Sequence, residues 1–256
     1  MTLTLTPLVD IPLVKPGDSL AQIILLALEH TEIVLQDGDI LVIAQKIVSK
    51  AEGRLVNLES VIPTERAFDL AEKTQKDPRF VELVLQESRS VLRYRPGTLI
   101  VEHRQGFVCA NAGIDHSNVR GEGGAPEDWV LLLPENADES ARRLRAELQS
   151  ATQTGSLGVL IIDSHGRAWR MGTVGAAIGL AGLPGLVDLR GKSDLFGYQL
   201  RVTQVAAADE LAAAASLIMG QAAEGQPVVH VRGFPFTLRE GNLSELIRPI
   251  DMDLFR

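Results

Sequence analysis

The chain has 256 residues, with 25 Lys and Arg against 33 Asp and Glu, a formal net charge of −8 and 45% hydrophobic residues. Its length and apolar content suffice for a stable core without disulfides. The acidic balance argues against a protein that mainly coats nucleic acid or an anionic membrane, because phosphate contacts need many Lys and Arg.

The first predicted elements are a helix and a buried strand. Ser19 offers a side-chain oxygen that caps a helix, and apolar residues follow at helical spacing from Leu20 to Leu28. Asp37 and Gly38 predict a turn, after which residues 40–44 are uniformly apolar. We therefore expect a strand over 40–44 that is buried on both faces.

A second helix and three strands are predicted further along. Asp77 followed by Pro78 is typical of a helix start, and an apolar stripe runs from Phe80 to Leu85. Strands are expected over 90–94, 98–103 and 107–110. Residues 117–128 are rich in glycine and charge, which favours an exposed loop.

The second half of the chain mixes helices and strands in the same way. We expect a helix over 137–150, a buried strand over 157–162, an alanine-rich helix over 207–223 and a strand over 227–231. Strands and helices do not alternate as in a doubly wound parallel sheet, so we predict an α+β fold with mixed sheets. No linker-like shift divides residues 1–256, which favours a single unit that can contain a smaller subdomain.

The cysteine count and the apolar stretches of the sequence bear on the compartment and on membrane insertion. Cys109 is the single cysteine, which excludes an internal disulfide and a thiolate metal cage and fits a reducing cytoplasm. The stretch 171–187 is apolar, but five glycines and Pro184 make it a poor helix. We expect no membrane-spanning segment and no nucleic-acid partner.

Two acidic segments are candidate cation sites. Asp115 lies in the segment 111–118, which follows an apolar strand and contains Asn, Ser and Gly, and Asp163 follows another apolar strand. Carboxylates with neutral oxygens nearby are what Mg²⁺ or Mn²⁺ prefers, and Ser164 adds such an oxygen. The alternative is that each aspartate lies in an ordinary solvated turn.

The sequence also contains cationic side chains and loops that can bind a phosphate group. Arg167 and Arg170 follow Asp163, Lys50 lies in a loop near a glycine, and residues 219–226 follow a helix. The alternative for Lys50 is a solvated cation, and the glycines of 219–226 are also explained as helix stops.

Other kinds of site are disfavoured. His116 and His165 each follow one of the aspartates, but without further Cys or His ligands exposed turn histidines are the simpler explanation. The sequence lacks the G-x-S-x-G motif of serine hydrolases. The segment 185–193 resembles a P-loop, yet it has five residues between its glycines instead of four.

Taken together, these segments resemble the coenzyme F420-0:L-glutamate ligase family, which adds glutamate to the deazaflavin coenzyme F420. The resemblance covers nearly the whole chain, and the order and spacing of its segments make it specific. The segments are 11–14, 16–18, 37–39, 48–54, 111–115, 117–119, 163–170, 209–210, 219–220 and 231–233.

The resemblance implies a site and its ligands. GTP would be bound by Ile11, Pro12, Leu13, Val14, Gln45, Lys50, Asn118, Met219, Gly220, Gln221, Ala222, Ala223, Glu224, Gly225 and Gln226. Asp115 and Asp163 would hold one divalent cation, Mg²⁺ or Mn²⁺, and Ser164 and Gln221 would help to hold a second. A monovalent cation such as K⁺ is a further candidate cofactor.

The implied activity is a GTP-dependent amide ligation. The terminal carboxylate of coenzyme F420-0 would be activated as an acyl phosphate and joined to L-glutamate, which gives F420-1, GDP and phosphate, with the number of glutamates left open. The resemblance also implies an intertwined homodimer in the cytoplasm. Because the chain ends at Arg256, we expect a stand-alone ligase without the C-terminal flavin-binding domain that some relatives carry.

Three departures from the family pattern involve four residues. Gln45 replaces the usual Ser or Thr, Ser164 replaces the commoner Thr, and Ala222 and Ala223 replace glycines. Ser164 keeps the hydroxyl that a cation needs, whereas the other changes leave the choice of nucleotide open. The alternatives are a non-catalytic nucleotide- or deazaflavin-binding homologue and a ligase of the same fold that uses another carboxylate acceptor.

Overall fold

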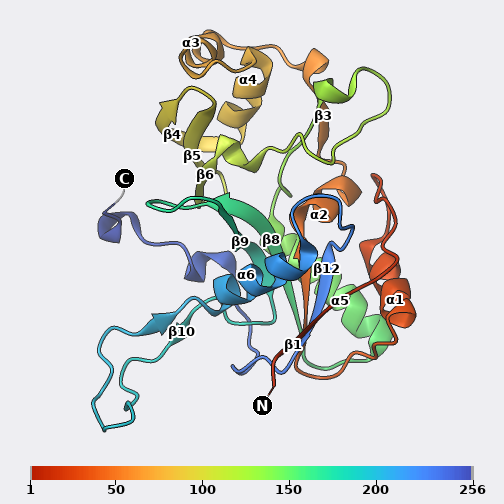
Figure 1. The fold of residues 1–256 in the computed structure, drawn as a ribbon, viewed down its shortest axis with the longest axis vertical. Coiled ribbons are helices and arrows are strands. Elements are labelled where there is room, and N and C mark those ends of the chain that lie inside the picture. The colour runs from red at the N-terminus through yellow and green to blue at the C-terminus, as the bar shows by residue number, and fades with distance from the viewer. Residues whose placement is uncertain (1, 255–256) are drawn as a thin grey trace.

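The centre of the molecule is a five-stranded mixed sheet. The computed structural model describes residues 2–254, and the strand order is β1-β12-β2-β8-β9 (Figure 1). The strands are β1 (Thr4–Pro7), β2 (Asp39–Ala44), β8 (Leu157–Gly166), β9 (Thr173–Ala181) and β12 (Val228–Arg232). β2 and β8 are parallel and the other neighbouring pairs are antiparallel. The predicted α+β class with mixed sheets is therefore confirmed.

The parallel strands β2 and β8 determine the edge of the sheet at which the chain continues after each of them. Its register runs from Asp39 opposite Leu157 to Ala44 opposite Ile162. Because parallel strands end at the same edge, the residues after Ala44 and after Ile162 emerge side by side. This edge carries the site described below.

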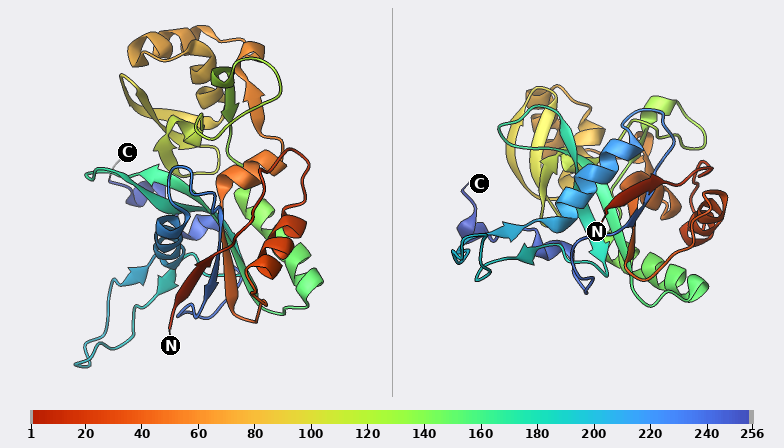
Figure 2. Two further views of the ribbon diagram at one scale, coloured as in Figure 1. Left: turned by 45° about the vertical axis from the view of Figure 1, so that its right-hand side comes forward. Right: turned by 60° about the horizontal axis from the view of Figure 1, so that its bottom comes forward.

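Helices cover both faces of the sheet. The helix α5 (Ala137–Thr152) packs on β8 and β9, and α1 (Leu20–His30) packs beside α5. On the opposite face α6 (Ala207–Met219) crosses β9, as Figures 1 and 2 show. Alternate residues of β2 enter the two cores: Leu41 and Ile43 face one core, and Ile40 and Val42 face the other.

A smaller group of elements lies beyond the carboxyl edge of β2 and β8, at the top of Figure 1. It contains α3 (Glu65–Thr74), α4 (Pro78–Gln86), a three-stranded sheet of β4 (Ser88–Arg95), β5 (Thr98–His103) and β6 (Val108–Ala110), and the pair β3 (Leu55–Asn57) and β7 (Trp129–Leu131). The short helix α2 (Gln45–Ala51) begins the connection from β2 to this group. Buried apolar residues of both groups belong to one continuous core.

The remaining elements are short. An arm that projects from the body begins with β10 (Val187–Asp188) and returns with β11 (Gln204–Val205). Single turns of 3₁₀ helix occur at η1 (Leu58–Ser60), η2 (Asn111–Gly113), η3 (Pro126–Asp128), η4 (Leu243–Glu245) and η5 (Ile250–Met252). Within residues 2–254, none of the helices has the length and apolar character needed to span a membrane.

The predicted helix starts are confirmed, but two predicted ends are wrong. Ser19 and Asp77 are N-caps whose side chains accept backbone hydrogen bonds. The helix expected to reach residue 223 ends at Met219, because Gly220 adopts φ 73°. The strand expected to stop at residue 162 continues to Gly166, because it forms a hairpin with β9 that the sequence did not predict.

Gly175 allows α6 to lie close to β9. A Cβ atom at this position would lie 2.4 Å from the carbonyl oxygen of Ala212 and 2.6 Å from Cβ of Ser216, both in α6. Gly175 is also paired with Ser164 across the hairpin. The close helix–sheet contact therefore lies directly behind the end of β8.

We predict that Gly175→Ala lowers the free energy of unfolding by about 1–3 kcal/mol, because the methyl group must push backbone atoms of α6 away from β9. Urea denaturation measures the change. Gly155→Ala is the control, because its nearest neighbour lies 3.6 Å from the added atom, which is an ordinary contact. Equal stability of the two variants would contradict the packing described here.

Candidate active site

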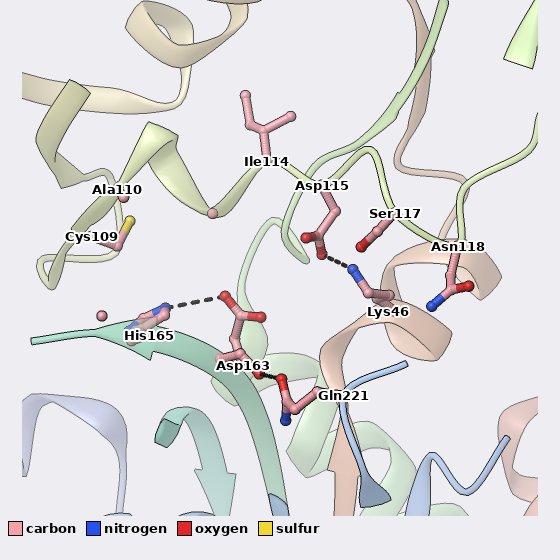
Figure 3. Close-up of a pocket in the computed structure, with 13 residues that line it drawn as sticks. Lys46, Cys109, Ala110, Ile114, Asp115, Ser117, Asn118, Asp163, His165 and Gln221 are labelled. Atoms are coloured by element: carbon pink, nitrogen blue, oxygen red, sulfur yellow. Dashed lines mark hydrogen bonds and ion pairs between the residues drawn. The ribbon is translucent and has the colours of Figure 1, made fainter. Parts of the chain in front are cut away.

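A pocket of about 210 Å³ opens at the carboxyl edge of β2 and β8. Three segments that are far apart in the sequence line it: the start of α2, residues 109–118, and the end of β8 (Figure 3). Gln221, just after α6, completes the lining. The two aspartates singled out from the sequence, Asp115 and Asp163, both belong to it.

A compact turn delivers Asp115 to the pocket. Asn111 and Ala112 both have positive φ, and the Asn111 side chain accepts a hydrogen bond from the Leu99 amide at 3.1 Å. Asp115 then exchanges two backbone hydrogen bonds with Leu131. This isolated bridge fixes the backbone, so the carboxylate has a defined direction even though it lies in a loop.

The Asp115 carboxylate meets two side chains from the first turn of α2. Gln45 donates a hydrogen bond from Nε2 to Oδ2 at 2.7 Å, and the Lys46 ammonium forms an ion pair with the same oxygen (Figure 3). The Ser49 hydroxyl donates to Gln45 Oε1 at 2.9 Å, which orients the amide so that its NH₂ group faces Asp115. Gln45 and Ser49 are both buried.

Asp163 is held from the opposite side of the pocket. His165 Nε2 lies 3.1 Å from Asp163 Oδ2, and the two side chains are only 13% and 14% exposed. The ring of Phe107 packs against His165 with centroids 5.4 Å apart and stacks on His103 at 4.9 Å. The histidine is thus clamped between an aromatic ring and the carboxylate.

The two aspartates have opposite electrostatic environments. Burial raises the pKa of Asp115 above its ordinary value, Lys46 opposes this shift, and the charge of Asp163 adds to it. Burial also disfavours the charged form of Asp163, but His165 and the Ser164 amide outweigh it and hold the Asp163 pKa below its ordinary value. Each carboxylate is close enough for its charge to act on the other.

Polar contacts tie the end of β8 to the segment after α6. The Ser164 hydroxyl donates to Gln221 Oε1 at 2.7 Å, and Gln221 Nε2 donates to Ser216 Oγ at 2.9 Å. Asn118, which has φ 57°, donates from Nδ2 to the carbonyl of Ala222 at 3.1 Å. The loop 111–118 and the segment 220–226 are therefore connected directly.

Some of the other residues assigned to nucleotide binding lie beside the pocket, and others lie apart from it. Lys50 is half-buried, one turn of α2 beyond Lys46, and burial followed by the Lys46 charge lowers its pKa. The segment Ile11–Val14 does not line the pocket. Three residues later, the Gly17 amide donates to the carbonyl of Ala51 at the end of α2. Of residues 219–226, Gln221 alone lines the pocket. Met219 is buried, Gly220 has φ 73°, and Ala222 contacts the pocket residue Asn118 through its carbonyl. The residues that do not line the pocket are Met219, Gly220, Ala222, Ala223, Glu224, Gly225 and Gln226.

The structure corrects two expectations and adds one residue. His165 is not an exposed turn histidine but a largely buried partner of Asp163, whereas His116 is exposed. Arg167 and Arg170 lie on the β8–β9 hairpin beyond the residues that line the pocket. The sequence analysis did not identify Lys46 as a site residue. Lys46 closely follows an apolar strand, and this same pattern identified Asp163.

The oxygens of this pocket suit a hard divalent cation. The carboxylates of Asp115 and Asp163 and the neutral oxygens of Ser164 and Gln221 form an oxygen-rich donor set of the kind that Mg²⁺ and Mn²⁺ bind. Within residues 2–254 no group of three or more His, Cys, Asp or Glu is arranged to hold a metal ion. The Cys109 thiol also lines the pocket, but burial raises its pKa to about 12, so it stays neutral.

Fold and site define an α+β protein with a two-aspartate polar pocket at the carboxyl edge of a parallel strand pair. The model of the F420-0:Gamma-glutamyl ligase family matches residues 8–233. The chain therefore belongs to this family, as the motif resemblance implied.

Named relatives match over nearly their whole length. The "Coenzyme F420:L-glutamate ligase" of Methanothermobacter thermautotrophicus is 47% identical over 258 residues, which cover 100% of both chains. The protein of the same name from Methanopyrus kandleri is 47% identical and covers 95% of this chain and 93% of its own. That of Methanocaldococcus jannaschii is 41% identical and covers 96% and 94%.

We predict that Lys46→Met raises the pKa of Asp115 further, because Lys46 supplies the largest favourable interaction with the charged carboxylate while burial continues to oppose it. A pH titration of the Asp115 carboxyl carbon by NMR measures the change. Lys192→Met, at an exposed position on the arm, is the control. An unchanged Asp115 pKa would contradict the ion pair.

Proposed function

We propose that this protein is a GTP-dependent ligase that joins L-glutamate to the terminal carboxylate of coenzyme F420-0. The full-length similarity to proteins named Coenzyme F420:L-glutamate ligase supports the acceptor and the amino acid. The observation that carries the proposal is the convergence of Asp115 and Asp163 in one pocket, with Lys46 paired to Asp115 and Lys50 nearby.

The chemistry needs an activated carboxylate. A carboxylate oxygen of F420-0 attacks the γ-phosphorus of GTP, the bond to the β-phosphate oxygen breaks, and GDP leaves. The glutamate amine then attacks the carbonyl carbon of the acyl phosphate, loses a proton and expels phosphate. Steps of this kind depend mainly on positioning and on charge stabilisation.

The described residues fit these requirements. We propose that Asp115 and Asp163 hold one divalent cation and that Ser164 and Gln221 help to hold a second; bound cations would neutralise phosphate oxygens. Lys46 and Lys50 supply fixed positive charge on one face of α2. When a cation approaches Asp115, Lys46 is free to turn from the carboxylate to a phosphate.

One assay separates the competing functions. The protein is incubated with GTP, Mg²⁺ or Mn²⁺, L-glutamate and F420-0, and the products are analysed by mass. A glutamate-sized increment together with GDP supports the ligase. GTP binding without product supports a non-catalytic binding homologue, and turnover only with another carboxylate supports a ligase of different acceptor specificity.

We predict that Asp115→Asn and Asp163→Asn each lower turnover by about 100-fold or more, because each change removes a negative oxygen ligand from the cation site. Steady-state rates measure the effect, and circular dichroism confirms that both variants are folded. Asp69→Asn, which alters an exposed ion pair with Lys73, is the control. Normal turnover in either site variant would contradict the metal assignment.

We propose further that the protein is a homodimer. The arm between β10 and β11 projects from the body (Figure 2). Leu195 and Phe196 are 97% and 95% exposed at its tip, and Val202, nearer β11, is 85% exposed. Exposed apolar side chains on an extended hairpin are stabilised when a partner covers them. A second copy of the chain is the partner that the family resemblance implies.

We predict that Phe196→Asp shifts the protein from dimer to monomer, because the charge would be buried without a partner in the interface. Sedimentation velocity measures the mass in solution. Ile62→Asp is the matched control, because Ile62 is 87% exposed but lies far along the chain from the arm. A monomeric wild type, or a Phe196→Asp variant that remains dimeric, would contradict this interface.

A further inference from the structure

A second cavity, of about 270 Å³, lies next to the active site and has no role in the chemistry above. Its lining includes Lys76, just after α3, Phe80 in α4, and His116. His116 directly follows Asp115, which lines the first pocket. The loop 115–118 is therefore a wall shared by the two cavities.

One cation in this cavity is available to a ligand. Lys76 Nζ lies 4.8 Å from the centre of the Phe80 ring, and among residues 2–254 no carboxylate forms an ion pair with it. Burial lowers the Lys76 pKa, and no negative group offsets that shift. A half-buried ammonium that packs on a ring gains stability when an anion reaches it.

The other cation of the cavity is already neutralised. Arg79 donates to both oxygens of Asp77, with Nη2 at 2.6 Å from Oδ2 and Nε at 3.1 Å from each oxygen. Asp128 adds further negative charge near Arg79. Glu127 lines the cavity as well, so three carboxylates accompany Arg79. Lys76 is the cation of this lining that has no carboxylate ion pair within residues 2–254.

Lys76 lies on the side of the cavity that Phe80 and His116 form. The His116 ring stacks on Phe80 with centroids 5.2 Å apart and an interplanar angle of 21°. Phe80 thus contacts both the Lys76 ammonium and the His116 ring. An anionic group bound by Lys76 would therefore lie across the shared wall from Asp115.

We propose that Lys76, framed by Phe80 and His116, binds an anionic group of a substrate of the ligation. The inference rests on the proposed function, because a ligase of this kind has two anionic organic substrates. The shared chemistry is a carboxylate or phosphate oxygen, which comes either from L-glutamate or from the deazaflavin coenzyme. Lys76 is then a binding residue, separate from the two-aspartate pocket.

The test is Lys76→Met, which keeps an aliphatic side chain over Phe80 and removes the charge. The Michaelis constants for glutamate, F420-0 and GTP are measured separately. A hydrogen bond to a charged group contributes substantially to binding free energy. We therefore expect the Michaelis constant for glutamate or for F420-0 to rise about tenfold or more. The constant for GTP and kcat at saturation should change less than twofold, and Lys76→Arg should restore part of the loss.

The matched control is Lys73→Met, because Lys73 lies one turn earlier and forms an exposed ion pair with Asp69. The substrate whose Michaelis constant rises in Lys76→Met is the one whose anionic group binds Lys76. Unchanged constants for both substrates in Lys76→Met would overturn the proposal while leaving the ligase function intact. If the wild type makes no product, titration calorimetry with glutamate and with F420-0 decides the question: weaker binding to Lys76→Met supports the site, and equal binding overturns it.

Discussion

The parallel register between β2 and β8 is the constraint on which the site depends. Because Ala44 lies opposite Ile162, the chain leaves both strands at one edge, where Lys46 and Asp163 line the same pocket. The loop that carries Asp115 is then held over this edge by its bridge to Leu131. A shift of this register by one residue would reverse the faces of the strand and separate these groups.

The chain is acidic as a whole, and charged side chains of both signs are gathered at the site. The net charge of −8 disfavours anionic ligands in general, yet two of the negative groups are directed into the pocket beside Lys46 and Lys50. Burial makes the Asp115 charge costly, while His165 stabilises that of Asp163. A cation between them would relieve the mutual repulsion, which is how an acidic protein can bind a polyanion.

Much of the fold was predictable because local rules decide it. Ser19 and Asp77 cap helices through their own side chains, and the apolar run 40–44 forms a buried strand. The sequence also indicated Asp115 and Asp163, because each follows an apolar segment. It did not predict β9, because the glycines in this stretch argue against a helix and are also atypical of a strand. In the structure two of them permit close packing: Gly175 against α6 and Gly179 against Ala137 of α5. Lys46 was not identified because its partner Asp115 lies far along the chain. His165 was expected to be an exposed turn residue, because the sequence did not show that β8 continues past Asp163 or that Phe107 packs on the ring.

The central claim, that Asp115 and Asp163 form one cation site, is tested most directly by Mn²⁺ binding measured with electron paramagnetic resonance in the presence of GTP. We predict two bound ions per wild-type chain, close enough for their spins to interact. Asp115→Asn and Asp163→Asn should each lose the spin-coupled signal while the protein remains folded. A wild type that binds no Mn²⁺, or variants that retain the coupled pair, would contradict the account.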